Sequence, residues 1–207
     1  MNMRTKEAIR YLGYGKNNVE DRIIQMIQES FAELDALANR KIVHRIFEIQ
    51  FNGDDEIVIA NMVIKSRKLF RNLYGCKNII LFAATLGTEV DRLIRKYERI
   101  DIAKAVVAQA CATTILEEYC DEWQEKISMN LRPRFSPGYG DFSILHQKDI
   151  LNLLEASKKI GLSMTDGYML TPTKSVTAVI GIGNANEICH IKGCEACEKT
   201  DCTYRRS

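Results

Sequence analysis

The sequence has no long hydrophobic run, few prolines and no excess of charge of one sign. No apolar stretch in its 207 residues approaches the roughly 20 residues that span a bilayer. The amino terminus carries no apolar run of signal-peptide length. We therefore expect a cytoplasmic protein with no membrane contact. Its 29 Lys and Arg against 27 Asp and Glu leave a net charge of +2, which argues against a nucleic-acid partner that needs a basic face.

Nucleotide-binding motifs are also missing. No Walker sequence occurs, and the glycine pairs at 13–15 and 181–183 lack the third glycine and the strand-to-helix setting of a dinucleotide fingerprint. An apolar fraction of 46% is too high for a disordered chain. The sequence therefore predicts one domain with a hydrophobic core.

Hydrophobic periodicity predicts helices and strands that mix without a regular βαβ alternation. Alternating residues at 41–51, an Asn-Gly turn and residues 56–60 predict a β-hairpin, and the apolar run 78–85 predicts a buried central strand. The longest helix is expected from Asp101 to about Ser128. We predict an α+β fold, with a mostly antiparallel twisted sheet packed with several helices, including one long central helix. The other expected elements are helices at 5–12, 18–37, 66–74, 89–99 and 144–159, and strands at 167–171 and 174–182.

The seven cysteines are unevenly distributed. Three lie apart, and four share a short tail with the spacing Cys-x4-Cys-x2-Cys-x4-Cys: Cys189, Cys194, Cys197 and Cys202. In a cytoplasmic chain such a cluster indicates a zinc site or an iron-sulfur cluster rather than disulfides, and the alternative is a reduced tail without metal. We divide the chain into a domain at 1–185 and a Cys-rich tail at 186–207, a possible metal site.

An irregular segment at 130–141 gathers polar groups between two helices. It carries Arg132 and Arg134, an aromatic hydroxyl and a carboxylate, and Pro133 and Pro137 stiffen it. An arginine on such a loop can form a two-pronged contact with a carboxylate or phosphate. The alternative is a surface connection whose arginines are solvated. The segment is therefore a candidate binding loop.

The loop also resembles a known family. Arg134-Phe-Ser-Pro-Gly-Tyr139 is similar to the Arg-x-x-x-Gly-Tyr signature of the activation domain of cobalamin-dependent methionine synthase, which binds S-adenosylmethionine. The stretch at 162–176 looks like a later segment of that domain, and residues 8–15 look like the opening of its free-standing relatives. The resemblance runs in order from about residue 7 to residue 183.

The resemblance implies a role for several side chains. Arg134 would hold the carboxylate of S-adenosylmethionine, backbone groups at Ser136 and Gly138 would contact the same ligand, and Tyr139 would be the catalytic-site residue that stands where the methyl group faces cobalt. Glu118 would pair with the ligand's ammonium or ribose. Glu117 is the adjacent alternative, about 100° away around the helix.

The chain also departs from the family. Gly140-Asp141-Phe142 stands where the multidomain enzyme has Pro-Ala-Cys-Pro, and the family's paired tyrosines beyond the Ser-Val strand are missing. The homocysteine, folate and corrinoid domains are absent from the sequence.

The resemblance therefore implies a stand-alone module that supports reductive methylation of cob(II)alamin. Its partners would be a separate corrinoid-binding methionine synthase that lacks its own activation domain, and an external electron donor. Two alternatives stay open: a metal-binding or electron-transfer accessory that works through the Cys tail, and a docking module without a small ligand.

Overall fold

The computed structural model describes residues 1–15 and 17–183. The helices are α1 (Met3–Tyr11), α2 (Asp21–Leu37), α3 (Arg67–Leu73), α4 (Thr88–Ile100), α5 (Ile102–Glu125), α6 (Gln147–Leu154) and α7 (Ala156–Ile160), with a 3-10 turn at Ile144–His146. The strands are β1 (Lys41–Asn52), β2 (Glu56–Ile59), β3 (Met62–Lys65), β4 (Asn78–Thr85), β5 (Ser163–Met164), β6 (Leu170–Thr171) and β7 (Ser175–Ile182). Within these ranges no helix combines the length and apolar character that crossing a bilayer requires.

Five strands form an antiparallel sheet in the order β3-β2-β1-β4-β7. β1 is the longest strand, and it pairs with β4 through residues 41–48 and with β2 through residues 49–52. The two short strands β5 and β6 form a separate pair. The predicted α+β fold with a mostly antiparallel sheet is confirmed, and so is the predicted β-hairpin.

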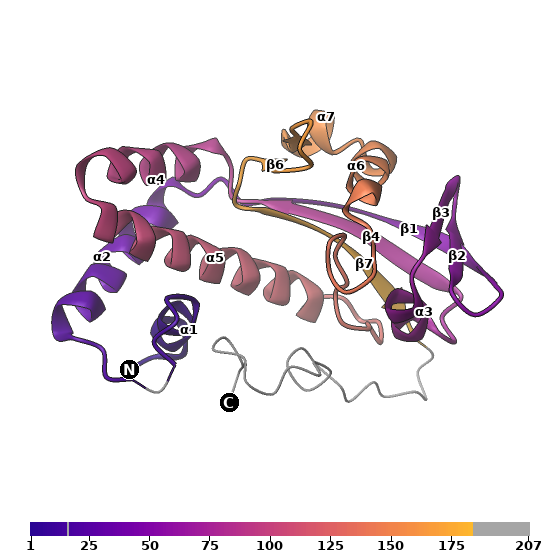
Figure 1. The fold of residues 1–207 in the computed structure, drawn as a ribbon, viewed down its shortest axis with the longest axis horizontal. Helices are drawn as coiled ribbons and strands as arrows, with labels where there is room; N and C mark the ends of the chain where they lie inside the picture. The colour runs from indigo at the N-terminus through magenta and orange to yellow at the C-terminus, as the bar shows by residue number, and fades with distance from the viewer. Residues whose placement is uncertain (16, 184–207) are drawn as a thin grey trace.

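Helices cover both faces of the sheet (Figure 1). β4 is buried along almost its whole length, because its side chains alternate between two hydrophobic clusters. One cluster joins the sheet to α1, α2, α4 and α5, and the other joins it to α3, α6 and α7. The residues of β4 in the first cluster are Ile80, Phe82 and Ala84, and those in the second are Ile79, Leu81 and Ala83. Because both faces of β4 are buried, apolar side chains are needed at every position, which explains the continuous apolar run in the sequence.

The helix predicted at 144–159 is interrupted. Glu155 adopts a left-handed conformation with φ 53°, which ends α6 before α7 begins. Leu154 and Ala156 are both fully buried, although neighbours two apart on one continuous helix point about 200° apart. The break therefore lets both residues reach the same core.

Two further boundaries differ from the prediction. α1 begins before Thr5 because the side chain of Asn2 accepts a hydrogen bond from the Thr5 amide at 2.8 Å and caps the helix. The strand expected at 167–171 is reduced to β6. The short strands β3 and β5 were not predicted.

Candidate functional site

The segment that carries Arg134 lies along the outer edge of β7, the side that pairs with no other strand of the sheet. The Arg132 amide donates to the Gly181 carbonyl at 2.8 Å, and the amides and carbonyls of Phe135 and Val179 exchange hydrogen bonds at 3.0 and 2.9 Å. Phe135 is buried in the cluster on the α6 side of the sheet. Because neighbouring side chains on an extended segment point to opposite sides, Arg134 is directed towards α5.

Arg134 is held by three side chains from one face of α5. Its guanidinium donates to Glu117 at 2.8 Å, to Asp121 at 2.7 Å and to Gln124 at 2.9 Å, and only 16% of the side chain is exposed. Burial alone lowers the pKa of Arg134, but the charges of Glu117 and Asp121 outweigh it and raise the pKa above its usual value. Two carboxylates face one guanidinium, so the cluster carries a net negative charge.

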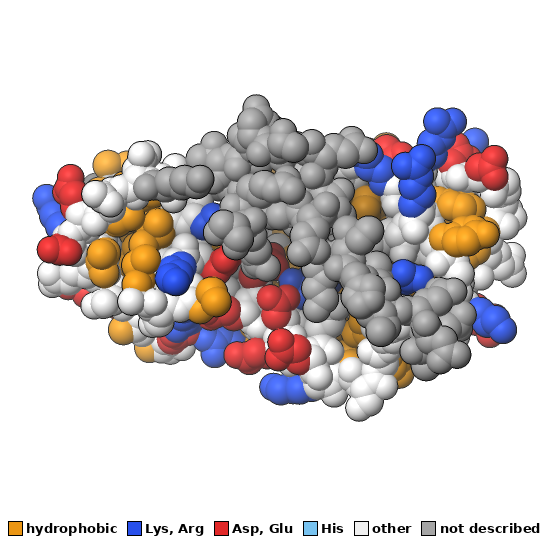
Figure 2. Space-filling view, turned by 90° about the horizontal axis from the view of Figure 1, so that it is seen from below, with side chains coloured by type: hydrophobic (Ala, Val, Ile, Leu, Met, Phe, Trp, Pro, Cys, Tyr) orange, Lys and Arg blue, Asp and Glu red, His pale blue; other side chains and the backbone are white. Residues whose placement is uncertain are grey.

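The wider surface of α5 adds to this charge. The carboxyl-terminal half of the helix also carries Glu118, Glu122 and Glu125. Figure 2 shows Asp and Glu side chains gathered on the lower face of the molecule, where Figure 1 places α5. A positively charged ligand is therefore favoured at this surface over a neutral one of the same shape.

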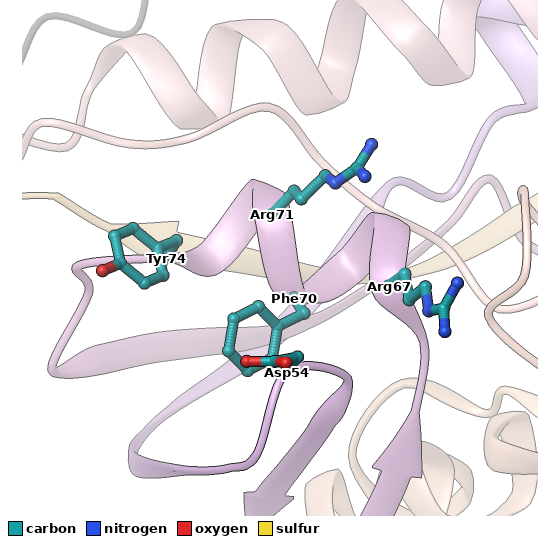
Figure 3. Close-up of a pocket in the computed structure, with 5 residues that line it drawn as sticks. All are labelled: Asp54, Arg67, Phe70, Arg71 and Tyr74. Atoms are coloured by element: carbon teal, nitrogen blue, oxygen red, sulfur yellow. The ribbon is translucent and has the colours of Figure 1, made fainter.

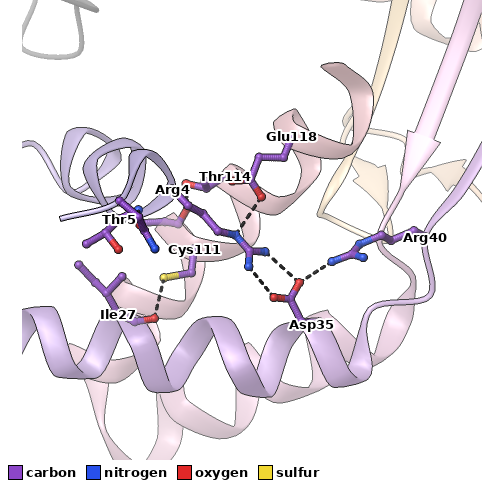
Figure 4. Close-up of polar contacts among 10 residues, drawn as sticks. Arg4, Thr5, Ile27, Asp35, Arg40, Cys111, Thr114 and Glu118 are labelled. Carbon is purple, nitrogen blue, oxygen red and sulfur yellow. Dashed lines mark hydrogen bonds and ion pairs between the residues drawn. The ribbon is translucent and has the colours of Figure 1, made fainter. Parts of the chain in front are cut away.

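Glu118 lies in a different cluster from Arg134. Its carboxylate is 2.9 Å from Nε of Arg4 on α1, and the two other nitrogens of Arg4 contact Asp35 on α2 at 2.6 and 2.9 Å (Figure 4). Arg40 also donates to Asp35. Burial raises the pKa of Glu118, and Arg4 partly opposes that effect. Of the two neighbouring glutamates, Glu117 thus contacts Arg134, the candidate binding arginine. Glu118 instead contacts Arg4, in a cluster that links α5 with α1 and α2.

The loop after Arg134 forms a compact turn that displays Tyr139. The Tyr139 amide donates to the Ser136 carbonyl at 3.1 Å, and the Gly138 amide donates to the Phe142 carbonyl at 2.7 Å. Gly138 has φ 88°, and a Cβ there would lie 3.2 Å from Cδ1 of Ile144, so a side chain is disfavoured. The Tyr139 ring packs edge-on against Phe135 at 5.2 Å between centroids, yet the residue is 53% exposed. Its hydroxyphenyl group is therefore accessible to a partner.

Asp141 attaches this turn to the start of α3. Its carboxylate accepts hydrogen bonds from the Ser66 hydroxyl at 2.5 Å, the Arg67 amide at 2.9 Å and the Lys68 amide at 3.2 Å. Burial alone raises the pKa of Asp141, but these hydrogen bonds outweigh it and lower the pKa below its usual value. The sequence predicted a helix that begins at residue 66 but not the contact of Ser66 with Asp141, since 75 residues separate the two.

A hollow of about 520 Å³ lies beside α3. It is lined by Asp54, Arg67, Phe70, Arg71 and Tyr74. Figure 3 shows the guanidinium groups of Arg67 and Arg71 pointing away from the Phe70 ring and from each other. These cationic groups do not converge on one ligand position.

The described cysteines do not form a metal site. Cys76, Cys111 and Cys120 are buried, and burial raises the pKa of both Cys111 and Cys120 to about 12. These two thiols are therefore poor nucleophiles at neutral pH. Across residues 1–15 and 17–183 no group of three His, Cys, Asp or Glu side chains is arranged to hold a metal ion. Cys189, Cys194, Cys197, Cys202 and the domain boundary expected at 185 lie outside the described residues.

Comparison with known proteins supports the fold. No protein-family model and no curated protein matches the chain. The crystal structure of the MetH reactivation domain bound to AdoHcy matches it with a TM-score of 0.62 and 19% sequence identity. The match covers 81% of this chain and 66% of that domain, so the chain spans slightly less than two thirds of its length. The chain therefore has the fold of the MetH reactivation domain.

Proposed function

We propose that this protein binds S-adenosylmethionine and supports the reductive methylation of a corrinoid carried by a separate methyltransferase. One observation carries the proposal. A fold that has been crystallised with AdoHcy here presents Arg134, against two carboxylates of α5, on the same loop as an exposed Tyr139. The choice of this loop rests on the resemblance in the sequence, and the fold match agrees with the family that the resemblance names.

The site suits the charges of S-adenosylmethionine. The ligand's carboxylate would displace Glu117 or Asp121 from the guanidinium of Arg134, because each of these contacts one nitrogen of the guanidinium whereas a ligand carboxylate could contact two. The displaced carboxylate then faces the ligand's ammonium, ribose or sulfonium. Glu117 takes the acidic role that the sequence resemblance implied for Glu118, since Glu118 is engaged by Arg4.

The loop would supply the remaining contacts. Backbone groups at Ser136 and Gly138 lie at the turn that leads from Arg134 to Tyr139. Tyr139 is exposed enough to contact a large second ligand while Phe135 supports its ring. The corrinoid supplies the reactive cobalt, which accepts one electron from an external donor and then the methyl group, and S-adenosylhomocysteine is the other product. The protein contributes position and electric field.

Calorimetry with S-adenosylmethionine tests the proposal. The wild-type protein should bind, alone or in the presence of a corrinoid-loaded partner, and Arg134→Ala should weaken binding by about 10- to 100-fold because it removes a charge-assisted contact. Arg22→Ala is the matched control, since Arg22 is exposed on α2 away from the loop. If the wild-type protein binds no S-adenosylmethionine in either setting, the proposal fails, and the docking module and the metal or electron-transfer accessory are the remaining alternatives.

The metal and electron-transfer alternative needs a separate measurement. Elemental analysis and an absorption spectrum of anaerobically purified protein distinguish iron with sulfide from zinc. Iron with sulfide favours an electron-transfer role for the tail, and zinc favours a structural one.

A further inference from the structure

Asp141 is the main polar link between the Tyr139 turn and the rest of the fold. Its carboxylate spans the start of α3, where it accepts from the Ser66 hydroxyl and from the Arg67 and Lys68 amides. The first amides of a helix have no partner inside the helix, so they are available to an incoming carboxylate. Asp141 satisfies two of them from a distant loop.

The turn also sits tightly on α3 at Gly140. This residue has φ 62°, and a Cβ there would lie 2.8 Å from Cδ of Lys68. The backbone between Tyr139 and Asp141 therefore runs close against the Lys68 side chain. The Asp141 carboxylate and the Gly140 backbone together hold the turn close to the start of α3.

We propose that Asp141 is a positioning residue for Tyr139. It holds the 136–141 turn on α3 so that the tyrosine ring is displayed at one fixed place on the protein surface. The inference rests on the proposed function, in which Tyr139 stands between S-adenosylmethionine and the corrinoid, and it assigns a role to a residue of the Gly140-Asp141-Phe142 segment that departs from the resembled family.

The contacts indicate a local role rather than support of the whole fold. The Ser66 side chain already caps α3 by accepting from the Leu69 amide at 3.0 Å, so the helix keeps a cap when Asp141 is removed. Phe142 is buried at 1% exposure and anchors the chain directly after the turn. Loss of the Asp141 carboxylate therefore frees the turn between two positions that remain fixed, Phe135 and Phe142.

Hydrogen exchange on the full chain tests the positioning directly. Asp141→Ala should speed exchange of the Gly138 and Tyr139 amides by about tenfold, the effect expected when a capping carboxylate is lost. Exchange in β4 should stay unchanged. Asp141→Asn, which keeps the shape and one acceptor oxygen, should give a smaller change. Asp166→Ala, at an exposed aspartate in another loop, is the matched control and should leave the turn unchanged.

A second readout separates positioning from binding. Asp141→Ala should lower the rate of corrinoid methylation by about tenfold and weaken S-adenosylmethionine binding by a smaller factor, because the contacts at Ser136 and Gly138 loosen while Arg134 and its α5 partners are untouched. Unchanged exchange in the turn, or an equal increase in β4, overturns the inference. If the wild-type protein methylates no corrinoid, the proposed function fails, while the exchange comparison still decides whether Asp141 holds Tyr139 in place.

Discussion

Arg134 and Asp121 form a 2.7 Å ion pair between the edge segment of the sheet and the acidic face of α5. Glu117 contacts the same guanidinium, so one cation is shared by two carboxylates. Two carboxylates against one guanidinium leave a net negative charge on this part of the surface.

This excess charge predicts discrimination by ligand charge. Asp121→Asn should reduce the preference for S-adenosylmethionine over the neutral sulfide S-adenosylhomocysteine by about fivefold, because one unit charge a few ångströms away contributes about 1 kcal/mol at a partly exposed site. Calorimetry with both ligands measures the ratio of affinities. Glu98→Gln is the control, since Glu98 is exposed and lies on α4 rather than on α5. An unchanged ratio in Asp121→Asn would show that the charge of Asp121 plays no part in selection.

A second prediction concerns Arg4, which joins three helices. Arg4→Met should lower the free energy of unfolding by about 1–3 kcal/mol, because Glu118 loses its cation and Asp35 keeps only Arg40. The guanidinium also lies 4.2 Å from the centre of the Phe31 ring, and methionine, which has no charge, cannot form this cation–π contact. Urea unfolding measures the loss, with Arg22→Met as the exposed control. Equal stability of the two variants would refute a structural role for the cluster.

Asp35 of this cluster predicts a contribution to stability that is lost in acid. Hydrogen bonds from Arg4 are the main cause that lowers the pKa of Asp35, against an opposing effect of burial, so the folded state binds its proton less readily than the unfolded state. The stabilising contribution is fully present above the unfolded pKa of about 3.9 and is lost as the pH falls through the lower folded value. Unfolding measured from pH 6 to pH 2 should show this loss in the wild type and a shallower one in Arg4→Met. Parallel curves for the two proteins would contradict the assignment.

The buried centre of β4 predicts a larger effect. Phe82→Ala should destabilise the protein by about 3–5 kcal/mol, because Phe82 is fully buried and its ring lies 4.6 Å from that of Trp123 on α5. Ile46→Ala on the neighbouring strand β1 should cost less than about 1 kcal/mol, since Ile46 is 48% exposed. Thermal or urea unfolding compares the two variants. A small loss in Phe82→Ala would mean that the helices on that face pack loosely.

The main elements of the fold could be predicted because their signals are local. The hairpin of β1 and β2 and the buried strand β4 each follow from side-chain periodicity over a few residues. The interruption at Glu155 could not be predicted in this way, because it depends on where α6 and α7 meet the same core. The two-residue strands β5 and β6 are too short to show any period.

The candidate site could be predicted only in part. The loop with Arg134 and Tyr139 stands out by composition and resemblance, and the roles implied for them remain predictions. The choice between Glu117 and Glu118 depends on how α5 is rotated against the sheet edge and against α1, which a single sequence does not specify. The contact between Ser66 and Asp141 likewise joins two segments that only the folded chain brings together.

The segment that carries Arg134 also covers an edge of the sheet. β7 is the last strand of the sheet, and residues 131–135 occupy its outer edge through the bridges at Ile182 and Val179. An uncovered strand edge is a template for pairing with other chains. Substitutions that loosen this segment would therefore expose β7 to intermolecular strand pairing, so resistance to aggregation depends on the segment that carries Arg134.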